Sequence, residues 1–561
     1  MTTAAEIESA LRAALGSDFI ESYRGADNRC FIRINRNRIR DICRTLLTDF
    51  QARLCYLSGM DLGLEGLDLF YSFSLDHGEK GLHVVVKANL PREDPKIDSL
   101  TLLTESANFP ERETAELLGI QFLDHPNLKH FMLPYEWPAK MESSSRTEIF
   151  GEEKSSEVQQ GTAWVPLRPS KESMLASVIP IGPYHPSLIE TAFFKLQVDG
   201  ERILNVDMKF GFNHRGIMRL MQNRSYWRNI YLAERVCGIC SQAHSTAFCR
   251  TAEMINKIDI PDRARYIRTF MCELERLQSH LLWLGVAMDL IGFQTLFMLS
   301  WKDREIVMDC QEMISGARVH KAMNTIGGAR RDIPKEIIPK IEAKLTELKK
   351  SLATTINTVV NDSIIKTRTK DVGLLTKKDA INLGVVGPTA RASGVDIDVR
   401  RDDPYAAYGE VPFEVITRSE GDVLAKVEVR LGEIKEALGI CEHCIDILQN
   451  VGGSLSAEVS EFAVGDAFGK VEALRGELVY YISSNGTNVP AAARMRTPSF
   501  NNNASIPYML REQTIADAPI IIGSIDPCFS CTDRLVELED VKTHRRYTAT
   551  LRQLSRKRKR L

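Results

Sequence analysis

The sequence predicts an α+β protein, in which a small α/β N-terminal domain precedes a large, mainly α-helical domain with a small antiparallel sheet. Two runs rich in β-forming residues, 67–75 and 82–90, flank a turn-like segment and predict a hairpin. Apolar residues recur at three- and four-residue steps from Ile267 to Leu284, which predicts a long helix. The chain has 561 residues, so it is long enough for more than one domain.

The composition excludes several classes of protein. Hydrophobic residues make up 44% and charged residues 26% of the chain, as in an ordinary globular protein. The net charge of −2 indicates no polyanionic partner, so we expect no nucleic-acid binding. The first residues lack a basic segment followed by an apolar one, so no secretory signal is predicted. Twelve cysteines without dense, even spacing are typical of a reducing compartment.

We place the N-terminal domain at residues 1–135 and expect a short helix over Asp98 to Glu105. The segment from Phe109 to Phe122 carries several charged residues, which could cap a helix or form an interface. With the Asp-His-Pro that follows, its order resembles the signature of the 30 kDa-type (NuoC-like) subunit of respiratory complex I. That resemblance implies a docking role for this domain.

The remaining chain divides into a linker and a second domain. Apolar periodicity disappears over residues 136–173, which predicts a linker. The second domain spans 174–534, and alternation between Phe193 and Phe210 predicts its antiparallel sheet. Further helices are predicted over 337–358 and 423–449.

The segment from Leu281 to Trp301 is the nearest approach to a membrane span in the sequence. Polar residues interrupt it, whereas a span needs about 20 predominantly apolar residues. We therefore predict one buried helix here, and any membrane attachment through partners.

Two CxxC pairs are the main chemical signal, Cys237 with Cys240 and Cys528 with Cys531. They lie too far apart in the sequence for one local finger, so a shared site requires the fold to bring them together. Four thiolates suit zinc, an iron-sulfur cluster or another thiophilic metal, and the cysteines alone leave this choice open. The second pair follows an apolar run, 520–525, which predicts a buried site.

The other cysteines are interpreted as structural. Cys441 and Cys444 lie three positions apart on a predicted helix, and we expect no metal there. The remaining six are predicted to be small buried apolar residues: Cys30, Cys43, Cys55, Cys249, Cys272 and Cys310.

The sequence around the two pairs resembles the large subunit of nickel-iron hydrogenases. Arg235 to Cys240 with His244 follow the pattern RxCGxCxxxH, and Asp526 to Cys531 follow DPCxxC. Further similar segments are Asn213–Gly216, Ile326–Asp332, Gly387–Gly394 and Tyr508–Arg511. With its NuoC-like domain, the chain looks most like the formate hydrogenlyase type, in the complex I-related, membrane-associated group with a NuoD-like second domain.

This resemblance implies a nickel-iron centre with carbon monoxide and cyanide on iron, and reversible, heterolytic reduction of protons to hydrogen. Cys237 and Cys528 would be terminal nickel ligands, and Cys240 and Cys531 would bridge the two metals. Cys528 would be the first proton acceptor. Magnesium is a further candidate ion, and no iron-sulfur cluster is expected in this chain.

The resemblance also implies roles for residues around the metals. His244 would donate to a bridging thiolate. Arg475 would overhang the open coordination position, and Pro498 and Ser499 would contact a cyanide ligand.

Three positions depart from the family pattern. Met218 stands where relatives carry a glutamate proton relay, Leu474 replaces a proline, and Tyr480 replaces a histidine. Because methionine cannot carry a proton, we expect another group to do so. The candidates are Glu234, Glu253 and Asp289. All four cysteine ligands remain, unlike in the quinone-site subunits of complex I.

The C-terminal segment 535–561 holds nine Lys and Arg residues against three Asp and Glu. The resemblance implies that a nickel-dependent maturation endopeptidase cuts after Arg534 and removes it. A permanent basic tail is the alternative.

The resemblance implies partners as well. These are a NuoB-like iron-sulfur small subunit, ferredoxin-like electron-transfer subunits, integral membrane complex I-like subunits and a formate dehydrogenase. They would hold the chain on the cytoplasmic side of the membrane as a peripheral subunit. Two alternatives stay open: a non-catalytic docking or scaffold subunit, and a quinone-reducing oxidoreductase subunit.

Overall fold

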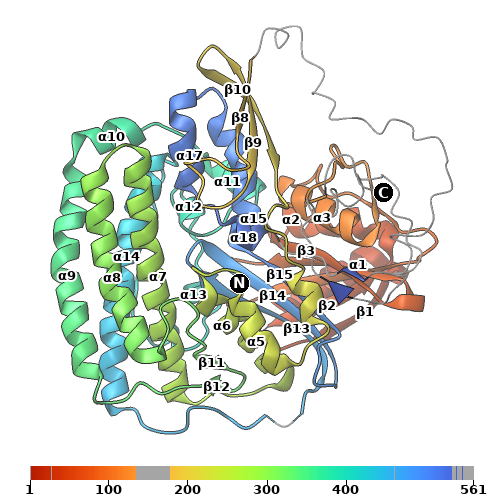
Figure 1. The fold of residues 1–561 in the computed structure, drawn as a ribbon. Coiled ribbons are helices and arrows are strands. Elements are labelled where there is room, and N and C mark those ends of the chain that lie inside the picture. Colours follow the sequence, from red (N-terminus) through yellow and green to blue (C-terminus); the bar gives the residue numbers. More distant parts are fainter. Residues whose placement is uncertain are drawn as a thin grey trace.

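A computed structural model describes residues 2–26, 28–76, 78–133, 177–459 and 461–533, with the backbone of two short paired strands at 538–539 and 546–547. The predicted linker 136–173 and the predicted cleavage site Arg534 lie outside the described residues. We call residues 2–133 the N-terminal module and residues 177–533 the C-terminal body. Figure 1 shows the two regions side by side.

A five-stranded sheet forms the centre of the N-terminal module, in the order β1-β2-β5-β4-β3. Strands β2 and β5 are parallel, and the other neighbours are antiparallel. The strands are β1 (Phe19–Arg24), β2 (Arg29–Ile34), β3 (Arg53–Asp61), β4 (Leu67–Ser74) and β5 (His83–Leu90). The antiparallel pair β4 and β5 confirms the predicted hairpin.

Three helices and a second, parallel strand pair complete the module. They are α1 (Ala4–Leu15), α2 (Ile39–Thr48), α3 (Asn108–Leu118), β6 (Lys96–Asp98) and β7 (Gln121–Leu123). The helix predicted over 98–105 is wrong. The buried carboxylate of Glu111 accepts hydrogen bonds from the Leu100 N–H at 2.6 Å and the Thr101 hydroxyl at 2.9 Å, which holds this segment as a turn.

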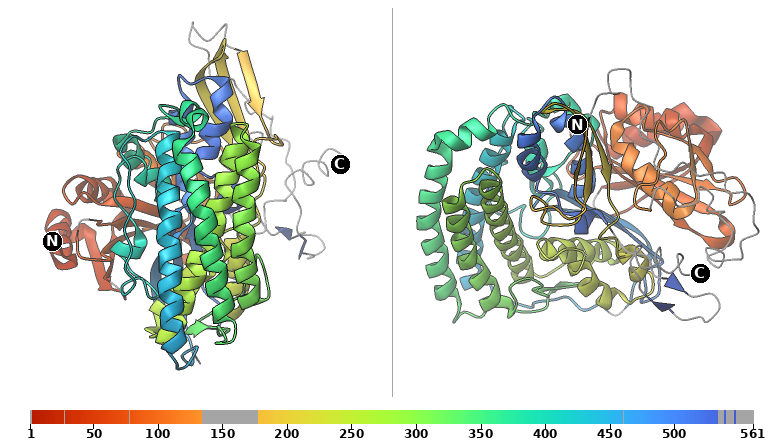
Figure 2. Two further views of the ribbon diagram at one scale, coloured as in Figure 1. Left: turned by 90° about the vertical axis from the view of Figure 1, so that its left-hand side faces the viewer. Right: turned by 45° about the horizontal axis from the view of Figure 1, so that its top comes forward.

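Four long helices form one layer of the C-terminal body and lie side by side (Figures 1 and 2). They are α7 (Asp262–Leu290), α8 (Gln294–Ser315), α9 (Ile338–Asn361) and α14 (Val423–Asn450). Helices α7, α9 and α14 confirm the predicted ones. The single helix predicted over 281–301 is wrong, because Gly292 at φ +87° separates α7 from α8. In the part of the chain that the structure describes, no helix is long and apolar enough to span a membrane.

Two three-stranded antiparallel sheets belong to the body. The first, in the order β10-β9-β8, confirms the predicted small sheet and contains β8 (Ser177–Ile181), β9 (Phe193–Asp199) and β10 (Arg202–Lys209). The second contains β13 (Val464–Ala473), β14 (Gly476–Asn485) and β15 (Ala492–Arg496). Its central strands are buried on both faces, so they lack the apolar and polar alternation that sequence analysis relies on.

Short elements connect these layers. They are α4 (Ile217–Met221), α5 (Tyr226–Glu234), α6 (Ser241–Asn256), the strand pair β11 (Asn324–Thr325) and β12 (Gly328–Ala329), α10 (Ser363–Thr369), α11 (Lys377–Asn382), α12 (Gly387–Arg391), α13 (Val399–Asp402), α15 (Pro498–Asn502), α16 (Ile506–Leu510), α17 (Ala518–Ser524) and α18 (Phe529–Thr532). In Figure 1, α6, α15 and α18 lie between the helical layer and the N-terminal module. The mixed helix and sheet content confirms the predicted α+β class.

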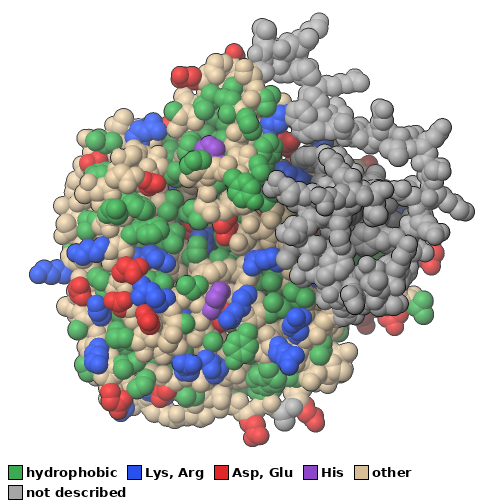
Figure 3. All heavy atoms as spheres, viewed as in Figure 1, with side chains coloured by type: hydrophobic (Ala, Val, Ile, Leu, Met, Phe, Trp, Pro, Cys, Tyr) green, Lys and Arg blue, Asp and Glu red, His purple; other side chains and the backbone are tan. Residues whose placement is uncertain are grey.

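The two regions share a buried apolar contact. Phe31 and Phe70 of the N-terminal sheet pack with Phe468, Val479 and Tyr481 of β13 and β14. The Phe70 and Tyr481 rings stack with centroids 4.4 Å apart. On the face shown in Figure 3, charged side chains of both signs are interspersed over the helical layer, while hydrophobic side chains gather near β8 to β10.

Candidate metal centre

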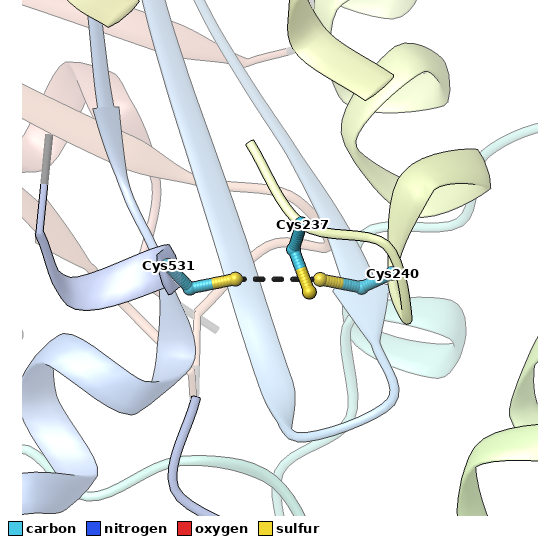
Figure 4. A group of neighbouring side chains, drawn as sticks. All are labelled: Cys237, Cys240 and Cys531. Carbon is cyan, nitrogen blue, oxygen red and sulfur yellow. Dashed lines mark hydrogen bonds between the residues drawn. The ribbon is translucent and has the colours of Figure 1, made fainter. Parts of the chain in front are cut away.

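The four cysteines of the two CxxC pairs converge at one buried point. The Cys237 and Cys528 sulfurs lie 3.4 Å apart, and so do those of Cys240 and Cys531. Cys237 lies in the turn between α5 and α6, Cys240 precedes the first residue of α6, and α18 carries the other pair. Figure 4 shows three of these side chains pointing toward one another from the two ends of the body.

The chemistry of this donor set fits a thiophilic metal. The hydrogen bond with Cys237 raises the pKa of both Cys240 and Cys528, and burial adds to it. Four buried thiols cannot all ionise together unless a cation supplies positive charge, and metal binding does so by displacing the protons. Among the described residues, no other group of three His, Cys, Asp or Glu side chains is close enough to hold an ion.

Arg475 is buried beside the thiols, in the turn between β13 and β14. Its Nε and Nη2 donate to the carbonyl and the carboxylate of Asp526, at 2.6 and 2.8 Å. Burial opposes its charge, but Asp526 and the Cys528 sulfur outweigh this effect and raise the pKa of Arg475. Its third nitrogen, Nη1, is buried without a hydrogen-bond partner in the described chain, which suits a donor to a bound group.

The backbone of Asp526 is itself unusual. It has φ +56°, in the left-handed region, although it directly precedes Pro527. The two bonds from Arg475 hold this conformation, and with it the approach of Cys528 to the site.

His244 and Tyr480 form a buried pair next to Cys531. The His244 Nε2 lies 3.7 Å from the Cys531 sulfur, and its Nδ1 is 2.8 Å from the Tyr480 hydroxyl. The tyrosine, which replaces a histidine of the family pattern, thus fixes the orientation of the His244 ring.

Three consecutive residues at the start of α15 face the second cysteine pair. The Ser499 hydroxyl accepts a hydrogen bond from the Cys528 N–H at 3.1 Å, and the Thr497 hydroxyl donates to the Cys531 carbonyl at 3.0 Å. Pro498 is buried between them, in the first turn of α15.

Arg215 joins the two cysteine motifs. Its Nη1 donates to the carbonyl of Arg235 at 2.7 Å and its Nη2 to that of Ser530 at 3.0 Å. The residue belongs to the Asn213–Gly216 segment, so the sequence pattern marked the segment but not this cross-link.

Sequence reasoning missed Glu190, which touches the site. One of its carboxylate oxygens lies 3.9 Å from the Cys528 sulfur, and the other accepts the Ser530 N–H at 2.7 Å. Glu190 also lines an open cavity of about 360 Å³ formed by residues 183–191, together with His185 and Tyr184. A lone acidic residue in a loop gives no periodic signal, so no pattern could have singled it out.

The acidic residues that we expected to carry protons are engaged elsewhere. Glu253 forms an ion pair with Arg268, and Asp289 accepts from Gln294. Glu234 accepts the Ala322 N–H at 2.8 Å, and burial raises its pKa. Met218 is buried, and its sulfur accepts the Met495 N–H at 3.4 Å.

Family models match most of the described chain. One for "Respiratory-chain NADH dehydrogenase, 30 Kd subunit" matches residues 32–147, and one for the 49 Kd subunit matches 290–464 and 454–534. A model for "Nickel-dependent hydrogenase" matches residues 215–298, which contain the first cysteine pair.

Individual proteins give the same result. The membrane-bound hydrogenase subunit alpha of Pyrococcus furiosus is 39% identical over 65% of this chain and 89% of its own length. Formate hydrogenlyase subunit 5 of Escherichia coli is 32% identical over 87% of this chain and 85% of its own. A chain in the structure of the membrane-bound sulfane sulfur reductase, an archaeal respiratory membrane complex, matches 64% of this chain and 98% of its own, with 31% identity and a TM-score of 0.62.

The fold and the four convergent thiols define a large subunit of the oxidoreductase class that joins respiratory NADH dehydrogenases with hydrogenases. Within that class, the chain belongs to the complex I-related hydrogenase large-subunit family, with the 30 kDa-type and 49 kDa-type parts fused in one polypeptide.

Proposed function

We propose that this chain is the catalytic large subunit of a membrane-associated, complex I-like nickel-iron hydrogenase of the formate hydrogenlyase type. The observation that carries this proposal is the meeting of four buried cysteine sulfurs from two distant motifs. Cys237 and Cys528 would hold nickel, and Cys240 and Cys531 would bridge it to iron. When bound, the centre supplies redox chemistry and a site for the heterolytic interconversion of protons and hydrogen.

The residues around the thiols would move the proton. The Cys528 sulfur accepts it, and the Glu190 carboxylate, 3.9 Å away, receives it next. Glu190 lines an open cavity, so the proton can leave toward the outside without crossing the helical layer. This route replaces the earlier candidates Glu234, Glu253 and Asp289, and it needs no acid at Met218.

Other side chains would orient the centre. His244, held by Tyr480, donates to the Cys531 thiolate and sets its direction. Arg475 keeps a charged donor in the site, and Pro498 and Ser499 would line the iron ligands. Because these groups are buried, the surroundings exclude bulk water and strengthen every polar contact.

The remaining expectations are part of the same proposal. The chain divides into domains at 1–135 and 174–534 with a linker at 136–173, and a maturation endopeptidase removes 535–561 by cutting after Arg534. A NuoB-like iron-sulfur subunit takes the electrons, and membrane subunits hold the assembly at the inner face of the cytoplasmic membrane.

Isotope exchange tests this function directly. A hydrogenase centre exchanges deuterium gas with water protons without an added electron carrier, so the purified complex should form HD and H2 from D2. The two NADH dehydrogenase family models favour quinone reduction as the second candidate. Quinone reduction without D2 exchange in metal-loaded protein would replace our proposal with that alternative, and neither activity would favour a docking role.

A further inference from the structure

We infer that the N-terminal module positions the metal centre by bracing residues 496–500, which hold Cys528 and Cys531 from behind. This role goes beyond docking, and it rests on the proposed function only in taking the four thiols as metal ligands. Two arms, one polar and one aromatic, run from the module to this segment. We call residues 496–500 the braced segment.

The braced segment is needed because the second cysteine pair has little support of its own. Cys528 and Cys531 belong to α18, which is only four residues long, and so short a helix is not stable by itself. Its backbone is held from the braced segment by Ser499, which accepts the Cys528 N–H, and by Thr497, which donates to the Cys531 carbonyl. Any shift of these two hydroxyls therefore moves both cysteines.

The polar arm ties strand β3 of the module to the start of the braced segment. Arg53 donates to both carboxylate oxygens of Glu477, at 3.1 and 3.0 Å. Glu477 also accepts from Arg496, whose Nε donates to the Cys55 carbonyl of β3 at 2.9 Å. Arg496 and Glu477 are almost fully buried, so this network has few alternative arrangements.

The aromatic arm reaches the other end of the segment. Phe109 and Phe131 of the module contact Phe500, with ring centroids 6.2 and 5.6 Å apart. Phe131 also contacts Phe210, which stacks at 5.8 Å on Phe529, the residue after Cys528. The module thus touches both the braced segment and, through one intervening ring, α18.

One buried carboxylate fixes the aromatic arm. Glu116 of α3 accepts the N–H groups of Phe131 and Met132, at 2.6 and 3.2 Å, and that of Leu133. Lys209 of the body donates to the Phe131 carbonyl at 3.1 Å. Although burial opposes ionisation, hydrogen bonds from His130 and from these backbone groups lower the pKa of Glu116. Its charge therefore persists and keeps Phe131 against the body.

The same helix offers a matched control. Glu111 is also a buried carboxylate on α3, but its hydrogen bonds go to Ser99, Leu100 and Thr101, all inside the module. Glu116→Gln should therefore disturb the centre, while Glu111→Gln should disturb only the module.

Hydrogen-deuterium exchange of the full-length chain tests the brace, with or without metal. In Glu116→Gln, we expect amides of 496–500 and 526–533 to exchange roughly tenfold faster, as when a buried, charge-assisted contact is lost. Glu111→Gln should leave those amides at the parent rate. Unchanged exchange in Glu116→Gln, or an equal increase in both variants, would overturn the inference.

Two further measurements keep the test decisive. Should Glu116→Gln fail to fold, Phe131→Leu and Arg53→Gln interrupt the two arms separately, and each should speed exchange in the same two segments. In metal-loaded protein, the carbonyl and cyanide stretching bands should also shift in the brace variants. Parent protein without such bands would contradict the proposed function, but local exchange changes would still uphold the brace.

Discussion

Two kinds of CxxC pair occur in this chain, and only one kind forms a candidate site. Cys441 and Cys444 have the same spacing as Cys237 and Cys240, and all four are buried. The first pair, however, lies within the 28-residue helix α14, whereas Cys240 lies at the start of a helix and faces a second pair. Spacing therefore predicts a site only where a motif interrupts regular structure and another motif meets it.

The electrostatic surroundings of the two kinds of pair also differ. Arg475, a buried cation, lies among the converging thiols and stabilises thiolates there. Burial raises the pKa of Cys441 and Cys444, and the Glu273 carboxylate raises it further. The protein thus favours thiolate at one place and thiol at the other, which agrees with metal binding at the first alone.

Removing a ligand should give the largest difference between the pairs. Cys528→Ser should abolish nickel retention and lower hydrogen evolution by more than about 100-fold, because even residues that only support a ligand cost about 10–100-fold. Elemental analysis and gas chromatography measure the two effects. Full nickel occupancy in this variant would exclude Cys528 as a ligand.

The proton route should show the next largest effect. Glu190→Gln keeps the shape of the side chain but removes its acid, so we expect turnover to fall about 100- to 10,000-fold with metal content unchanged. Asp289→Asn, which alters one of the earlier candidates, is the control and should evolve hydrogen at the parent rate. The reverse pattern would return the proton path to the α7 side.

The orientation of His244 should matter less. Tyr480→Phe removes the hydroxyl that holds the ring at 2.8 Å, and we expect a loss of about tenfold in metal affinity or turnover. Tyr481→Phe, at the adjacent position of β14, faces the N-terminal module and should leave both unchanged. Equal losses in the two variants would point to general destabilisation of the sheet.

The smallest effect is expected at the second kind of pair. Cys441→Ala removes a buried sulfur from α14 and should lower the free energy of unfolding by about 1 kcal/mol. Nickel content and hydrogen evolution should match the parent protein. A loss of metal would show that Cys441 has a role that its position inside the helix does not indicate.

The sequence predicted those features that leave a periodic or motif signal. The apolar steps along α7, α9 and α14 gave these helices, and the two cysteine motifs gave the converging thiols. Strands β13 and β14 were missed because both of their faces are buried, which removes alternation. Glu190 was missed because its role arises only when the loop 183–191 meets α18.

The central claim is that the four thiols hold nickel and iron, and one measurement tests it most directly. Elemental analysis and infrared spectroscopy should be carried out on the same purified, mature protein and on its Cys528→Ser variant. We predict nickel and iron together with carbonyl and cyanide stretching bands in the parent, and neither nickel nor intact bands in the variant. Zinc or no metal in the mature parent protein, without such bands, would contradict the claim.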